Sequence, residues 1–173
     1  MSKITVYSQG GFGGTSAEFQ HDVSDLADEG FKDAIASIKV IGQPWVAYYD
    51  KSFAGKQRVF EQGEYATLDD KGRFSSLKWV TADLTHPEIQ MFEQVNYQGG
   101  NKNTSKETNL QDIEDFSNIA SSHKVTRGVW VLYEFANRKG SQLIAYPGEQ
   151  VPSYVPLSFS DVARCVRPLL PSS

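Results

Sequence analysis

The chain has 173 residues with a formal net charge of −4, and 39% of its residues are hydrophobic. This length fits one domain or two small ones. The acidic balance and the scattered Lys and Arg residues give no basic footprint for nucleic acid, and no apolar run approaches the roughly 20 residues that span a bilayer.

The N-terminus enters a predicted strand at residues 4–7, without the apolar core of a signal peptide. A pattern then begins that recurs four times: an aromatic, four residues, a second aromatic, one residue and a glycine. It occupies residues 7–14, 48–55, 92–99 and 133–140, and only Arg138 replaces an aromatic. The closing glycines are 41, 44 and 41 residues apart, a repeat of supersecondary size. Each copy predicts a β-hairpin folded back over its sheet, closed by a glycine with positive φ or a close backbone approach.

About twenty residues after each glycine, a small residue followed two positions later by a base begins a final strand. These segments are Ser37-Ile-Lys-Val40, Ser76-Leu-Lys-Trp79, Ser122-His-Lys-Val125 and Cys165-Val-Arg-Pro168. Four short strands with a long connection before the last form a Greek key. The single cysteine, Cys165, excludes an intrachain disulfide, and its place among the serines predicts a structural small residue.

These features resemble the βγ-crystallins over essentially the whole chain. Units two and four are similar to the family's B-type motif and units one and three to its A-type motif. The B-type segments are Gln62-Gly-Glu-Tyr65, Trp130-Val-Leu-Tyr-Glu134 and Pro147-Gly-Glu149. The resemblance implies an all-β fold of two Greek-key sandwich domains in ABAB order, each of two four-stranded sheets. One Cys and two Met are few for a lens crystallin, so we expect a non-lens, epidermal-type member or a crystallin module.

Matching residues lie 85 positions apart, such as Trp45 with Trp130, so each half is one pair of units. We predict a first domain over residues 1–83 with motifs 3–42 and 43–83, a linker over 84–87, and a second domain over 88–173 with motifs 88–128 and 129–170. Turn residues and a proline crowd the linker. Trp45, Trp79 and Trp130 are expected to be largely buried. The polar connection 98–109 is expected to be a mobile loop, and its sequon at Asn103 to be unmodified.

No motif points to catalysis. His21, His86 and His123 fall in different units and are expected to be surface or turn residues. The glycine-rich segment 10–14 opens no helix, so it is not a phosphate loop. No serine lies in a nucleophile-elbow context. We expect a protein without enzymatic activity.

The resemblance implies calcium sites in the loops before the final strands. In the family these loops read Asn/Asp, Asn/Asp, any, any, Ser/Thr, Ser, and paired loops clamp two ions with oxygen ligands. Here all four depart from the pattern: residues 32–37, 71–76, 117–122 and 160–165. The family's pairing rule implies two surviving sites. They comprise Asp33 with Ser75 and the Arg73 carbonyl, and Asp161 with Ser121 and the Ile119 carbonyl.

The complementary pairs, Gly72 with Ala36 and Asn118 with Arg164, are expected to lack ligands. Because Lys32, Arg73 and Arg164 lie in these loops, any calcium affinity is expected to be weak. The alternative is that the loops are ordinary hydrogen-bonded turns.

The resemblance also implies that the two B-type units pair through three apolar side chains each. These are Val46, Val59 and Val80 facing Val131, Ile144 and Leu169. Val46 and Val131 follow buried tryptophans, so strand alternation turns them to the opposite face. The pairing can lie within one chain or be exchanged between two in a homodimer.

Two functions remain open. The first is a non-enzymatic structural or stress-related βγ-crystallin in the cytoplasm, with weak or vestigial calcium binding. The second is a recognition module or subunit of an aerolysin-like pore-forming protein, in which case a secreted form is expected. No residue supports an enzyme-inhibitor or sugar-binding use, and neither a nucleic-acid partner nor a membrane span is expected.

Overall fold

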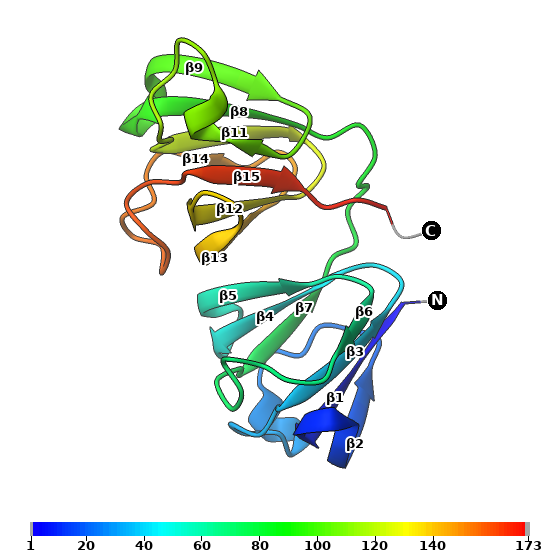
Figure 1. Ribbon diagram of the computed structural model, residues 1–173. Coiled ribbons are helices and arrows are strands. Elements are labelled where there is room, and N and C mark those ends of the chain that lie inside the picture. Colours follow the sequence, from blue (N-terminus) through cyan, green and yellow to red (C-terminus); the bar gives the residue numbers. More distant parts are fainter. Residues whose placement is uncertain (1, 172–173) are drawn as a thin grey trace. The chain divides into compact units, whose positions relative to one another are not determined.

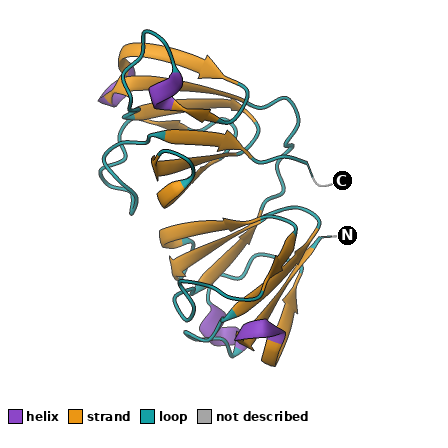
Figure 2. Ribbon diagram, viewed as in Figure 1, coloured by secondary structure: helices purple, strands orange, loops and turns teal. Residues whose placement is uncertain are grey.

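A computed structural model describes residues 2–171, which divide into two units, the first ending at Thr81 and the second running from Ala82 to Pro171. The division falls two residues before the predicted end of the first domain at residue 83, so residues 84–87 lie in the second unit. Strands and short 3₁₀ turns make up both units (Figures 1 and 2). No helix among the described residues is long and apolar enough to cross a membrane. The predicted all-β fold of two Greek-key domains is confirmed.

The first domain contains two antiparallel sheets. One has the strand order β2-β1-β3-β6, and the other β5-β4-β7. The strands are β1 (Lys3–Gln9), β2 (Gly13–Phe19), β3 (Ser37–Ile41), β4 (Trp45–Asp50), β5 (Ala54–Phe60), β6 (Gly63–Tyr65) and β7 (Ser76–Trp79). The predicted fourth strand of the second sheet is reduced to one bridge between Val23 and Leu77, because turn-forming Asp and Ser residues flank Val23.

The second domain repeats this plan with the orders β14-β11-β8-β9 and β10-β15-β12-β13. The strands are β8 (Glu88–Gln94), β9 (Gln98–Thr104), β10 (Thr108–Asn109), β11 (Ser122–Arg127), β12 (Trp130–Phe135), β13 (Lys139–Ala145), β14 (Gln150–Val151) and β15 (Cys165–Pro168). The prediction of a loop over residues 98–109 is wrong, because β9 pairs with β8 from Gln98 to Thr104. Its polar sequence suits an edge strand, where side chains face solvent.

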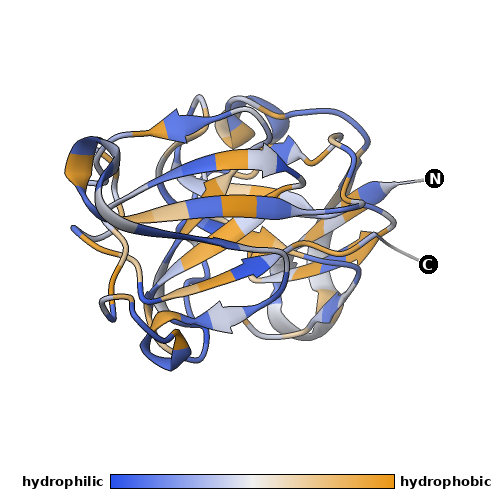
Figure 3. Ribbon diagram, turned by 90° about the horizontal axis from the view of Figure 1, so that it is seen from above, coloured by the Kyte–Doolittle hydropathy of each residue, from blue (hydrophilic) through white to orange (hydrophobic). Residues whose placement is uncertain are grey.

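Four 3₁₀ turns punctuate the chain: η1 (Gly10–Phe12), η2 (Leu26–Glu29), η3 (Val95–Tyr97) and η4 (Leu110–Asp112). Each domain has its own apolar core, and apolar and polar residues alternate along many strands (Figure 3). Trp45 and Trp130 are fully buried, as predicted. Trp79 is only partly buried, because it is the last residue of β7, and it stacks on Trp45 with ring centroids 6.4 Å apart.

The four predicted hairpins share one geometry. In each, the strand pairing shifts register just after the first aromatic. The second aromatic position, the residue before it and the closing glycine all have positive φ. The loop pairs are Gly11 and Phe12, Ser52 and Phe53, Asn96 and Tyr97, and Asn137 and Arg138. These left-handed residues cost free energy, so contacts around the loop must hold them in place.

The small residue that begins each final strand supplies those contacts. The hydroxyl of Ser37 donates to the Gln9 carbonyl (2.6 Å) and accepts the Phe12 N–H (3.0 Å). Ser76 and Ser122 make the same two bonds to their own hairpins. In the fourth unit, the buried Cys165 thiol accepts backbone N–H groups of the hairpin instead. The predicted structural role of this cysteine is therefore a hairpin clamp.

The exception at Arg138 has a physical explanation. In the first three units, the base two residues after the clamp lies over the second aromatic, as Lys39 does at 4.4 Å from the Phe12 centroid. In the fourth unit, the Arg138 guanidinium makes a bidentate ion pair with Glu107 (2.8 and 2.5 Å), and Arg167 donates to the Tyr133 hydroxyl (2.9 Å). An ion pair replaces the cation–π contact.

Candidate functional site

The four candidate calcium loops are anchored identically. In each, the N–H of the fifth residue donates to the carbonyl of the first hairpin aromatic. The pairs are Ala36 to Tyr7 (2.8 Å), Ser75 to Tyr48 (2.8 Å), Ser121 to Phe92 (2.9 Å) and Arg164 to Tyr133 (2.9 Å). The side chains at these four positions are therefore structurally equivalent, although their chemistry differs.

In the first domain, Asp33 and Ser75 line one cavity of about 510 Å³. Asp25 and Asp50 line it too, as do two lysines, Lys32 and Lys51. Asp33 adopts the left-handed conformation (φ 50°), which Asp tolerates better than most residues. Asp33 and Ser75 thus line one pocket, and their pairing around a cation stays a prediction.

Sequence reasoning missed Asp25 and Asp50. Asp25 precedes η2 and caps it by accepting the Ala27 N–H (3.0 Å), while Asp50 ends β4. Neither lies in the loop pattern. The one signal in the sequence was that Asp50 lies within the hairpin repeat at residues 48–55.

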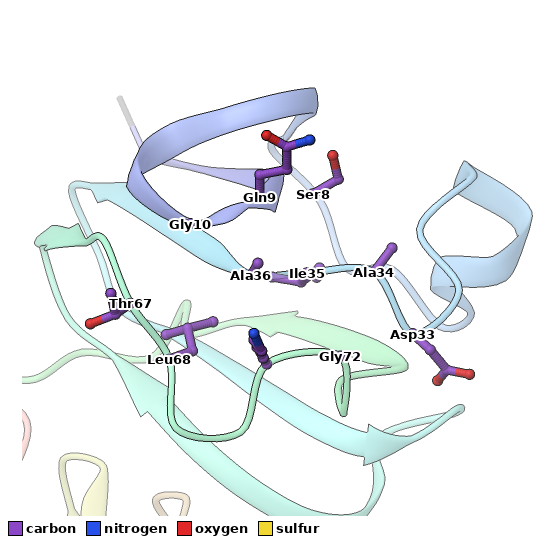
Figure 4. A pocket seen from close by; sticks show the side chains of 11 residues that line it. Ser8, Gln9, Gly10, Asp33, Ala34, Ile35, Ala36, Thr67, Leu68 and Gly72 are labelled. Carbon is purple, nitrogen blue, oxygen red and sulfur yellow. The ribbon is translucent and has the colours of Figure 1, made fainter.

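The other half of the pairing rule places Gly72 with Ala36, and these two residues line a second cavity of about 620 Å³ (Figure 4). The Gly72 N–H donates to the Ile35 carbonyl (2.9 Å), which ties the two loops together. Asp33 also borders this cavity, but its carboxylate points away from the gap between Ala36 and Leu68. At the two motif positions, this cavity has a hydrogen and a methyl group where the family pattern has oxygen ligands.

In the second domain, paired hydrogen bonds between Ala120 and Ala163 (2.9 and 2.8 Å) align the loops side by side. Ser121 is nearly buried and Asp161 is exposed. The Ile119 carbonyl already accepts a bond from the Ser117 hydroxyl (2.8 Å). Pairing of Asp161 with Ser121 around a cation stays a prediction.

Arg164 departs most from the family pattern. Its Nη1 donates to the Glu134 carbonyl (3.1 Å), and its guanidinium lies 5.8 Å from the centroid of the Phe135 ring.

Within residues 2–171, no group of three or more His, Cys, Asp or Glu side chains is arranged to hold a metal ion. A cation would need a mixed set of carboxylate, hydroxyl and carbonyl oxygens, which suits a hard ion such as calcium. The residues around Asp33 and Ser75 fit that chemistry, whereas a guanidinium does not.

The prediction that His123 is a surface or turn residue is wrong, although His21 and His86 are exposed as expected. His123 is fully buried on β11, where β3 has Ile38 in the first domain. Its Nδ1 is 2.7 Å from the Tyr154 hydroxyl, and its Nε2 has no hydrogen-bond partner among the described residues. Burial lowers the pKa of His123 to about 4.

The six predicted pairing residues lie on or directly after B-type strands. Val46 pairs in register with Val59, and Val131 with Ile144; Val80 and Leu169 directly follow β7 and β15. None of the six is a member of its own domain's core cluster. Pairing of the two domains through these residues stays a prediction.

These observations define a class of protein: two duplicated Greek-key domains whose hairpins are clamped by a serine or cysteine and whose paired loops resemble cation sites. Residues 3–80 and 88–168 match the family described as Beta/Gamma crystallin, and the chain belongs to this family.

Its relatives include the "Epidermal differentiation-specific protein" of Cynops pyrrhogaster, which is 40% identical over 98% of this chain and 50% of that protein. "Beta-crystallin B1" of Homo sapiens is 30% identical over 85% of this chain and 61% of that protein. The chain thus spans about half to three fifths of these two relatives. Among solved structures, a "beta gamma crystallin from Ciona Intestinalis" is 30% identical and covers 45% of this chain and 99% of its own, with a TM-score of 0.44.

Proposed function

We propose that the chain is a non-enzymatic structural or stress-related beta/gamma crystallin of a non-lens, epidermal type, acting in the cytoplasm. The observation that carries this proposal is the 40% identity, over nearly the whole chain, to a protein named for epidermal differentiation. The chain's own residues support it, because buried cores and clamped hairpins make two rigid domains.

The proposal includes a weak calcium site in the first domain, made by Asp33, Ser75 and the Arg73 carbonyl. The shared cavity and the nearby carboxylates of Asp25 and Asp50 support it. Lys32 and Lys51 oppose a cation there, so the dissociation constant is expected at about 10⁻⁴–10⁻³ M, the weak end of protein calcium sites. A second weak site would join Asp161 and Ser121 to the Ile119 carbonyl.

Asp33→Ala is expected to abolish calcium uptake by the first domain, and Asp161→Ala uptake by the second. Isothermal titration calorimetry with calcium, at low ionic strength, measures both. Gly72→Ala is an unsuitable control because Gly72 has a positive φ; Asp69→Ala, an exposed carboxylate outside these loops, is suitable. Unchanged uptake in both Asp33→Ala and Asp161→Ala would remove the assignment and leave the loops as ordinary turns.

The structural role further includes pairing of the two B-type units through the six aliphatic residues, within one chain or between two copies. Val59→Asp is expected to separate the domains or lower their stability by several kcal/mol, since complete burial of one such side chain is worth roughly 1.5–3 kcal/mol. Analytical ultracentrifugation and small-angle scattering would show a more extended particle or the loss of a dimer. Scattering and stability matching the unmutated chain would reject the pairing.

A second function is favoured by the length of the first relative. This chain matches about half of the epidermal differentiation-specific protein, so that protein contains other regions beside the matched one. The chain would then be a recognition module or subunit for an aerolysin-like pore-forming protein, and would be secreted. Dye release from lipid vesicles tests this. The chain mixed with such a protein should release more dye than that protein alone, and equal release would count against this function.

A further inference from the structure

We propose that Arg164 provides a fixed internal cation in the second domain, in the place that corresponds to the Asp33–Ser75 pocket of the first domain, and so excludes calcium there. Asn118 and Arg164 lie outside the two proposed calcium pairs, and they occupy positions equivalent to Asp33 and Ser75 of the first domain.

Backbone hydrogen bonds establish which residues are equivalent. Ser75 and Arg164 both donate their N–H to the first hairpin aromatic of their unit, and both accept an N–H at their own carbonyl. The donors to those carbonyls are Leu26 in the first domain (2.8 Å) and Leu110 in the second (3.0 Å). The residues just before these donors are Asp25 and Asn109, which therefore correspond.

The partner loop is placed by the bridge between Ala120 and Ala163. In an antiparallel pairing, this register sets Arg164 opposite Ile119 and beside Asn118. Asn118 lies 85 residues after Asp33, the spacing that relates the two domains. Arg164 and Asn118 are thus the second-domain counterparts of Ser75 and Asp33.

The charge of the site is inverted between the domains. The first-domain pocket is lined by Asp25, Asp33 and Asp50 and by two lysines. The corresponding second-domain residues are neutral, except that Arg164 stands in the position of Ser75. By position, the three carboxylates become Asn109, Asn118 and Phe135, and the lysines at 32 and 51 become Ser117 and Ala136.

The guanidinium of Arg164 is held by two contacts on β12. It donates to the Glu134 carbonyl (3.1 Å) and lies over the Phe135 ring, the residue that replaces Asp50. The Asn109 side chain makes two hydrogen bonds with Asn137 (2.8 and 2.9 Å). Because an arginine stays protonated in proteins, its charge repels a divalent ion at any physiological pH.

The test removes this charge in a chain that already lacks Asp33 and Asp161, so the outcome does not depend on the proposed calcium sites. In that background, Arg164→Ser with Asn118→Asp is expected to take up one calcium ion per chain by calorimetry. Calcium at ten times the measured dissociation constant should lower the unfolding equilibrium constant of the second domain about tenfold. Arg164→Lys with Asn118→Asp keeps the positive charge and should take up none.

Two results would overturn the inference. One is calcium uptake by the Arg164→Lys double variant equal to that of the Arg164→Ser double variant. The other is no uptake by the Arg164→Ser double variant although its circular dichroism matches the parent. If Arg164→Ser does not fold, Arg164→Gln provides a longer neutral side chain for the same comparison. Loss of calcium binding in Asp33→Ala and Asp161→Ala alone bears only on the proposed function.

Discussion

The second domain is expected to lose about 3 kcal/mol of stability as the pH falls from 6.5 to 4. The pKa of buried His123 is lowered from 6.5 to about 4. Above pH 6.5 the imidazole is neutral in both the folded and unfolded states, so this group adds no pH dependence. Between pH 6.5 and 4 only the unfolded state binds the proton, and unfolding becomes easier by about 1.4 kcal/mol per pH unit.

The surroundings of His123 explain why no charge relieves this cost. In register, β8 places Met91 and β14 places Val151 opposite His123. The segment after β14 contributes the neutral Tyr154 hydroxyl, whose own pKa burial raises further. The neighbouring Lys124 ammonium lies 4.5 Å from the Tyr97 centroid. Burial alone lowers the pKa of the imidazole.

Urea unfolding of the whole chain at several pH values between 7 and 4 measures this effect. His123→Leu is expected to remove the part of the stability loss at acid pH that comes from His123. His123→Ile is a second variant, because Ile38 occupies the same position in the first domain. Comparing each variant with the parent at every pH cancels the titration of surface carboxylates. A parent and a variant with the same dependence on pH would show that the pKa of His123 is the same in the folded and unfolded states.

Much of this fold could be predicted from the sequence because its key features are local. A hairpin with left-handed loop residues leaves a fixed spacing of aromatics and glycine, and the clamp serine follows that glycine after 21 to 23 residues. What the repeat could not reveal were departures whose partners are distant in sequence. Arg138 pairs with Glu107, and Nδ1 of His123 bonds to the Tyr154 hydroxyl; each partner is 31 residues away in sequence.

The same locality limits what could be predicted of the candidate site. The family pattern identified Asp33 and Ser75, which share a cavity. It could not identify Asp25 and Asp50, because they reach that cavity from elements outside the loops. A polar residue such as His123 also suggests a surface position when it is judged by residue type alone, whereas its place in the repeat matches a core position.

The largest backbone effect is expected at Gly140, the glycine that closes the fourth hairpin. Its φ of 81° is a conformation that costs a side chain about 1–2 kcal/mol. A Cβ there would also meet the Phe135 ring at 2.7 Å and the Glu134 Cβ at 2.9 Å. The Glu134 Cβ is attached to the backbone of β12, which pairs with β13, so it cannot move freely, whereas the half-exposed Phe135 ring can move only by rotating its side chain. Overpacking of this kind adds about 1–3 kcal/mol.

Gly148→Ala is the matched control for Gly140→Ala. Gly148 lies in the same domain with a φ of 84°, but a Cβ there would have no heavy atom within 4 Å. Gly148→Ala should lower the free energy of unfolding by about 1–2 kcal/mol, the cost of the positive φ alone. Gly140→Ala should lower it by about 2–5 kcal/mol, measured by urea unfolding at pH 7. The difference between the two variants measures the crowding in the hairpin. Equal losses would mean that Phe135 and Glu134 yield to the methyl group, and that the closing glycine is required for its φ and not for close approach.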